Sequence, residues 1–301
     1  MGDRNVDALN KAFGDAVARL SGEVSAQAAA AWDSAKDKRV LAGRLLSTGS
    51  NVWSRGAELA MAYFRLRMAL EFGYTVPSVF IAPSNQPKWY QLGDLVAEFE
   101  SVARVPAGVT IVGARRIGVS PLKAGAVSLR DKRARDVQLI TDRFEDSLAS
   151  VEAGDEDKVR SLFAGTMEHL AAAGYRQLIT DVVPRSGRYS GWARVSRTGK
   201  PCAWCAMLIS RGPVYHNEAT ATTRRSRGIG KGGATLSEAD NGHPHCQCYV
   251  VPVKSRAEWL VGDLFSQGRQ FQSEWITGMS LKEWRKQYYQ TRAKQWRDKL
   301  K

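Results

Sequence analysis

The 301-residue sequence has only four cysteines and four histidines, and it contains no apolar run long enough to span a membrane. Its first residues, MGDRNVDALNKAF, include acids and lack the apolar core of a secretory signal. We therefore expect a chain made in a cytoplasm, where disulfides are rare. A hydrophobic content of 44% and a charged content of 25% are typical of folded proteins, which argues against a disordered chain.

Acidic residues are scarce in two segments, although the whole chain carries a net charge of +14. Residues 182–235 hold ten Lys or Arg against one acid, and residues 282–301 hold eight against two, so the remainder is nearly neutral. Local basicity is typical of a surface that faces a polyanion, although it also aids solubility. The candidates for DNA contact are Arg224, Arg225, Arg227, Lys231, Lys282, Arg285 and Lys286.

The first part of the chain predicts helices followed by an interrupted segment. Residues 1–73 are rich in alanine and place Leu59, Tyr63, Leu66 and Leu70 on one amphipathic stripe, with Gly73 closing the last helix. Prolines interrupt residues 74–120, which we expect to be a β or irregular segment. Within it, 109-VTIVG-113 is a candidate buried strand.

The second part predicts helices, a compact module and a tail. Residues 121–253 combine helical patterns, one of them with a hinge at Gly174, with a Cys/His module that ends in the strand 249-YVVPV-253. Residues 254–301 end in a basic helix with an aromatic stripe, which we expect to pack on its own domain or a neighbour. The predicted fold class is α+β, predominantly α, with a long helical N-terminal region and a small C-terminal α+β module.

All four cysteines lie in two short segments, 201-PCAWC-205 and 243-HPHCQC-248. A C-x2-C turn brings two thiolates within chelating range, and the side chains of an extended C-x-C point to the same face. Two such clamps complete a tetrahedron, so we expect a structural zinc ion. Its candidate ligands are Cys202, Cys205, Cys246 and Cys248, with His243 or His245 as an alternative ligand.

Three other interpretations of the cysteines remain open. Disulfides fit the even number but not a reducing compartment. Metal-free packing fits because unmodified cysteine behaves as a small apolar residue. A catalytic zinc is less consistent with the pattern, since no H-E-x-x-H or comparable motif accompanies the thiols.

The run GWARVS, then PCAWCAMLISRGPVY, then HPHCQCYVVPV resembles the Mu F-like minor head proteins of tailed bacteriophages, particularly those of actinobacterial phages. That family carries C-x2-C, a variable insert and H-P-x-C-x-C ending in a strand with Pro-Val. The matching positions here are Cys202, Cys205, His243, Pro244, Cys246, Cys248, Pro252 and Val253. The resemblance covers roughly residues 190–253, and it departs from the family at His245, where many members have a small polar residue.

The resemblance implies a minor capsid protein that acts near the portal inside the head, in assembly, DNA packaging or genome delivery. The implied partners are the portal protein, the major capsid protein or scaffold, and packaged double-stranded DNA, with no membrane partner. Such a protein is expected in the virion, and in the host cytoplasm during assembly.

Two alternative functions remain. Members of the family are often labelled capsid maturation proteases, but the sequence has no G-x-S-x-G motif and no nucleophile–base pair that can be named. A cytoplasmic zinc-containing nucleic-acid-binding protein is the second alternative. The forty residues between the two cysteine pairs are too many for a compact finger that enters a DNA groove.

Overall fold

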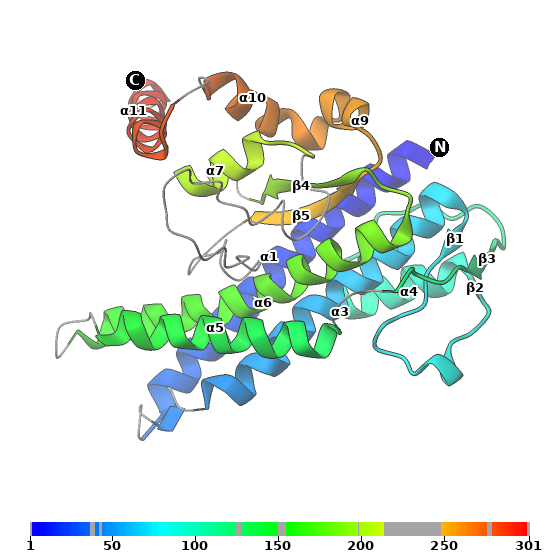
Figure 1. Ribbon diagram of the computed structural model, residues 1–301, viewed down its shortest axis with the longest axis horizontal. Coiled ribbons are helices and arrows are strands. Elements are labelled where there is room, and N and C mark those ends of the chain that lie inside the picture. The colour runs from blue at the N-terminus through cyan, green and yellow to red at the C-terminus, as the bar shows by residue number, and fades with distance from the viewer. Residues whose placement is uncertain are drawn as a thin grey trace.

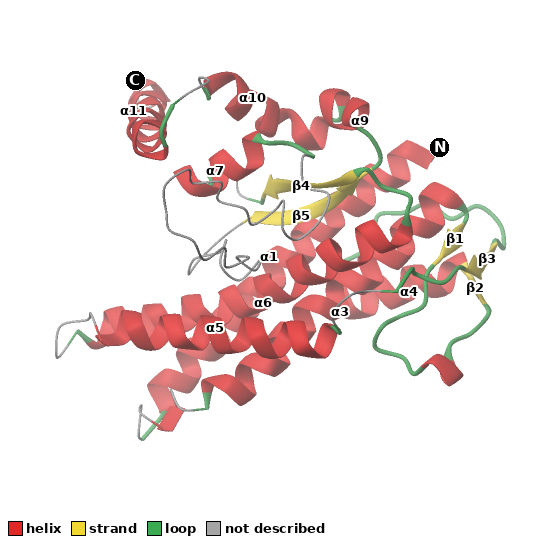
Figure 2. Ribbon diagram, in the orientation of Figure 1, coloured by secondary structure: helices red, strands yellow, loops and turns green. Residues whose placement is uncertain are grey.

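The computed structural model confirms a predominantly helical protein with two small sheets (Figures 1 and 2). It describes residues 2–36, 40–41, 44–124, 128–149, 155–197, 199–213, 248–275 and 279–299. No helix among these residues is long and apolar enough to cross a membrane.

Four long helices run side by side along the length of the molecule (Figure 1). They are α1 (Gly2–Ser34), α3 (Leu45–Phe72), α5 (Leu129–Ala149) and α6 (Glu156–Ser186). The helix predicted to end at Gly73 does so, and this glycine has the left-handed φ of 76° that such a position favours. The apolar stripe predicted for α3 covers only one face of the helix, whereas residues 59–69 are buried on every face by α1, α4, α5 and α6.

Gly174 marks a close helix crossing, and the prediction of a hinge there is wrong because α6 continues without a break to Ser186. A Cβ atom at Gly174 would lie 2.0 Å from the backbone oxygen of Trp53, and one at Gly56 would lie 2.1 Å from that of Ala171. The two glycines therefore let the backbones of α3 and α6 touch. This reciprocal contact fixes the centre of the bundle.

A three-stranded sheet lies at one end of the bundle, beside α4 (Leu92–Ala103). The prediction of a β or irregular segment over residues 74–120 is therefore only partly right, because α4 is an amphipathic helix that buries Leu92, Leu95, Phe99 and Ala103. Its strands are β1 (Tyr74–Thr75), β2 (Trp89–Gln91) and β3 (Arg116–Val119), and η1 (Pro83–Asn85) lies in the loop between β1 and β2. The prediction of a buried strand at 109–113 is wrong: this segment is irregular, and Val112 is 73% exposed. The strand begins after it, at Arg116, where Ile117 is the buried residue.

The C-terminal module is built on an antiparallel ribbon of β4 (Gly191–Ser196) and β5 (Cys248–Val253), in which the predicted 249–253 strand is confirmed. Around it lie α7 (Ala203–Ser210), α9 (Arg256–Val261), η2 (Asp263–Phe265), α10 (Ser266–Glu274) and α11 (Leu281–Lys299). All six residues of β5 are buried, because α1 and α6 contact the ribbon on one side and the C-terminal helices cover the other (Figure 1).

A buried polar network joins this module to the bundle. The fully buried Arg67 of α3 donates to Asn10 Oδ1 of α1 at 3.2 Å and to the Tyr63 hydroxyl at 2.8 Å. The same guanidinium forms ion pairs with Glu71 at 3.2 Å and with Glu258 of α9 at 3.3 Å. Two carboxylates beside the guanidinium offset the cost of burying its charge. The network therefore links three elements that are distant in sequence.

Candidate metal centre

The first C-x2-C segment forms the start of α7. Cys202 has extended backbone angles at the N-cap, and its sulfur accepts a hydrogen bond from the backbone N–H of Cys205 at 3.4 Å. A thiol at this position replaces the hydroxyl or carboxylate that caps most helices. The helix N-terminus therefore holds the sulfurs of Cys202 and Cys205 near its first turn.

Of the second cysteine segment, the structure describes Cys248, which lies at one end of the β ribbon. Cys248 is the first residue of β5 and pairs with Ser196, the last residue of β4. Its sulfur lies 3.6 Å from that of Cys205, and the two residues are only 1% and 2% exposed. This separation is well beyond a disulfide bond, which is about 2.05 Å. It is close to the separation of about 3.8 Å between two thiolates on a tetrahedral zinc with Zn–S bonds of about 2.3 Å.

Two buried arginines converge on Cys248. Arg176 of α6 donates to the Cys248 carbonyl at 2.9 Å and approaches its sulfur at 3.6 Å, and Arg194 of β4 approaches the same sulfur at 3.5 Å. Tyr175 also donates to this carbonyl, at 3.1 Å. Both guanidinium groups thus face the Cys248 sulfur, and cationic groups near a cysteine are a feature of thiolate sites. The donor set and its charges therefore fit a thiolate-bound metal.

The C-terminal helix α11 packs against the first cysteine segment and donates hydrogen bonds to it. Trp284 donates its indole N–H to the carbonyl of Ala203 at 2.7 Å, and Tyr288 donates its hydroxyl to the carbonyl of Pro201 at 2.5 Å. Both rings are buried, at 0% and 3% exposure, so the prediction that the aromatic stripe packs on its own domain is confirmed for these two residues. Burial raises the pKa of Tyr288, against the opposing effect of the neighbouring Arg292. Tyr288 thus stays a neutral donor.

Several predicted site residues lie outside the part of the chain that the structure describes. They are Cys246, His243, His245, Arg224, Arg225, Arg227 and Lys231. Within the described residues, no group of three His, Cys, Asp or Glu side chains is arranged to hold a metal ion. Lys282, Arg285 and Lys286 are exposed on α11.

Sequence reasoning missed Arg176 and Arg194. Arg194 lies in the strand GWARVS, where a cation between apolar residues of a buried strand was the available clue. Arg176 follows an alanine-rich stretch, and nothing in its spacing points to a cysteine 72 positions further along. Only the packing of α6 against β5 brings it to the thiol.

Comparisons with known proteins match the part of the chain that contains this cluster. The family described as "VG15 protein" matches residues 123–270. This match, together with the two phage relatives that follow, indicates a bacteriophage protein family. The Gene 15 protein of Mycobacterium phage D29 is 33% identical over 121 residues, which cover 34% of this chain and 42% of that protein. The Gene 15 protein of Mycobacterium phage L5 is 27% identical over 138 residues, which cover 38% of this chain and 46% of that protein.

The matched segments thus span less than half the length of these curated relatives. No solved structure matches the chain. The VG15 match runs from just before α5 into α10, so it includes both cysteine segments, Arg176 and Arg194. It leaves out α1, α3, α4 and α11, and therefore also the three exposed basic residues of α11.

Proposed function

We propose that this chain is a minor capsid protein of a tailed bacteriophage, acting near the portal inside the head during assembly, DNA packaging or genome delivery. The observation that carries the proposal is the coincidence of two features in residues 123–270. This segment is similar to a phage protein family, and it also holds the cysteine pattern that resembles the Mu F-like minor head proteins.

A structural zinc ion is part of the proposal. Cys202, Cys205 and Cys248 are its candidate ligands among the described residues, and Cys246, with His243 or His245 as the alternative, supplies the remaining donor. When bound, the metal joins the start of α7 to the start of β5, and so closes the base of the long segment between them. Arg176 and Arg194 then offset the negative charge of the thiolates.

We also propose that the basic surface contacts packaged DNA without reading its sequence. Lys282, Arg285 and Lys286 lie exposed on one helix, which is the arrangement needed to meet successive phosphates. Arg224, Arg225, Arg227 and Lys231 extend the same proposal to the segment between the cysteine pairs. Portal, major capsid protein or scaffold are the proposed protein partners.

Quantitative peptide mass spectrometry of immature and mature heads tests the role. A few copies per particle, retained through maturation, are expected for a minor capsid protein. Presence in immature heads followed by loss favours the maturation protease or a scaffold role. Absence from both kinds of particle favours the cytoplasmic nucleic-acid-binding alternative. A measurable base preference in DNA binding would support that alternative further.

A further inference from the structure

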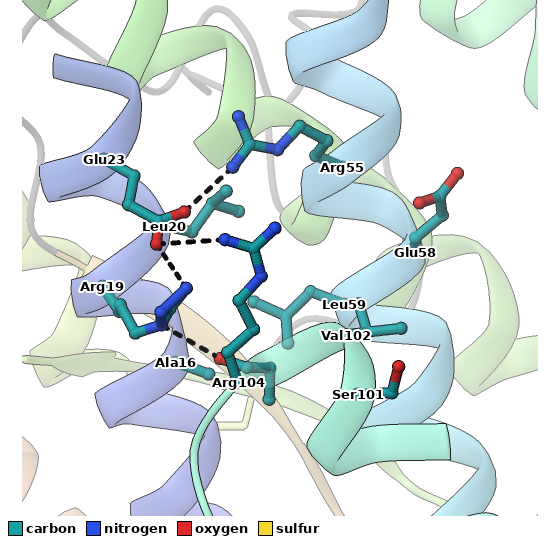
Figure 3. Close-up of a pocket in the computed structure, with 11 residues that line it drawn as sticks. Ala16, Arg19, Leu20, Glu23, Arg55, Glu58, Leu59, Ser101, Val102 and Arg104 are labelled. Atoms are coloured by element: carbon teal, nitrogen blue, oxygen red, sulfur yellow. Dashed lines mark hydrogen bonds and ion pairs between the residues drawn. The ribbon is translucent and has the colours of Figure 1, made fainter. Parts of the chain in front are cut away.

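A cleft of about 200 Å³ lies between α1, α3 and the end of α4, far along the chain from the cysteine segments and outside the VG15 match (Figure 3). Three arginines line it, one from each helix or its end: Arg19, Arg55 and Arg104. Its acidic lining residues are Glu23 and Glu58. Apolar side chains, among them Leu20, Leu59 and Val102, complete the wall.

The three guanidinium groups converge on the single carboxylate of Glu23. Arg19 pairs with its Oε1, Arg55 pairs with its Oε2 at 3.0 Å, and Arg104 approaches Oε1 at 3.5 Å. Figure 3 shows Glu58 on the other side of the cleft, turned away from this cluster. Three positive charges therefore meet one negative charge, and the excess favours a second oxyanion beside Glu23.

Arg104 has a backbone conformation that is unusual for a residue other than glycine. Its φ is 52°, and it is the one non-glycine residue with positive φ among those described. It ends α4 in the left-handed conformation, where glycine is the usual residue. Its side chain is 64% exposed, so the pairing with Glu23 stabilises the fold little. A strained arginine that contributes little to stability is typical of a binding site.

We propose that this cleft binds an acidic peptide segment of a partner protein, in which a carboxylate side chain adjoins an aliphatic one. The carboxylate takes the guanidinium donors of Arg55 and Arg104 beside Glu23, as Glu23 itself already does. The aliphatic neighbour covers Val102, which is 38% exposed, while Leu59 lies buried beneath the wall. A phosphodiester carries the charge but offers no aliphatic group for this wall, so the apolar lining favours the peptide.

Fluorescence anisotropy of the full chain with a labelled peptide of alternating leucine and glutamate tests the proposal. Arg104→Gly removes the guanidinium and relieves the strain of the left-handed backbone, so we expect a melting temperature equal to or slightly above that of the parent protein and a Kd raised about tenfold. Arg55→Gln is expected to weaken binding similarly. Glu23→Gln removes the competing internal carboxylate, and we expect it to tighten binding several-fold.

Arg160→Gln serves as the matched control, because Arg160 forms an exposed ion pair with Asp33 at 2.7 Å and does not line the cleft. It should leave the Kd unchanged. A Kd that is the same for Arg104→Gly and the parent protein overturns the proposal. The proposal is also overturned if inorganic phosphate or duplex DNA binds in an Arg104-dependent way and the peptide does not. That result assigns the cleft to nucleic acid.

Discussion

The sulfur of Cys205 lies 3.6 Å from the sulfur of Cys248, although the two residues are 43 positions apart in the chain. The contact joins the first turn of α7 to the first residue of β5. It is the geometric basis for the proposed zinc centre, whose stability and composition are open to direct measurement.

Purified protein is expected to contain about one zinc ion per chain, and Cys248→Ser should lose it. Because the metal joins the start of α7 to the start of β5, its loss should lower the free energy of unfolding by about 3 kcal/mol or more. Metal analysis and thermal unfolding measure both effects. A chelator should lower the melting temperature of the parent protein but not that of the variant. Metal-free parent protein with four titrating thiols and unchanged stability would contradict the zinc proposal.

Arg176→Met keeps an unbranched apolar stem but removes the positively charged guanidinium beside Cys248. We expect zinc affinity to fall by about tenfold or more, as for other partners of metal ligands. Competition with a colorimetric chelator gives the affinity. Arg160→Gln, on the same helix but exposed, is the control and should have no effect. Equal affinities in all three proteins would remove Arg176 from the metal site.

Gly174→Ala forces a methyl group against the backbone oxygen of Trp53, which no side-chain adjustment relieves. The helices α3 and α6 must separate, and we expect a loss of about 3 kcal/mol or more of unfolding free energy. Gly22→Ala is the matched control, because Gly22 lies in α1 with nothing within 4 Å of an added Cβ. Urea denaturation should show Gly22→Ala to be stabilising, by up to about 1 kcal/mol. A mild effect at Gly174 would mean that the helices do not cross this closely.

Replacing Lys282, Arg285 and Lys286 together by glutamine should weaken DNA binding equally for all sequences. The slope of log K against log salt is negative for DNA binding, and each lost phosphate contact should reduce its magnitude by about 0.9. Titrations of duplex DNA at several salt concentrations give this slope. Arg256→Gln removes an exposed cation of α9 outside the two basic segments and is the control. An unchanged slope in the triple variant would exclude α11 from DNA contact.

Stability should fall at alkaline pH because of Tyr63. Burial raises its pKa from 10.0 to about 12, against the opposing effect of Arg67. Between these two values the folded state holds the proton that the unfolded state has lost, so the free energy of unfolding decreases as pH rises through this window and is unaffected below it. Urea denaturation at about pH 9 and about pH 11 should show a smaller decrease for Tyr63→Phe. An equal decrease in both proteins would assign the effect to other groups.

Local sequence information was sufficient for the long helices and the last strand, but it missed α4 (Leu92–Ala103), which lies in the segment predicted to be β or irregular. Alanine-rich composition and apolar spacing predicted helices in the regions of α1, α3, α5 and α6, because these signals act within a few residues. The same reasoning failed at 109-VTIVG-113, where an apolar β-branched run remains exposed and irregular. A short apolar run becomes a strand only if a partner strand and a covering layer are present, and both are supplied by distant parts of the chain.

Three features could be predicted from the chain alone: the helical character, the grouping of all four thiols and the concentration of positive charge. Each depends on residue type and short-range spacing. The folded protein was needed to show that Gly174 is a crossing point, that Arg176 and Arg194 meet Cys248, and that three arginines surround Glu23. These relationships join residues of different elements, and the packing of those elements depends on the whole buried surface. No local pattern in the chain contains that information.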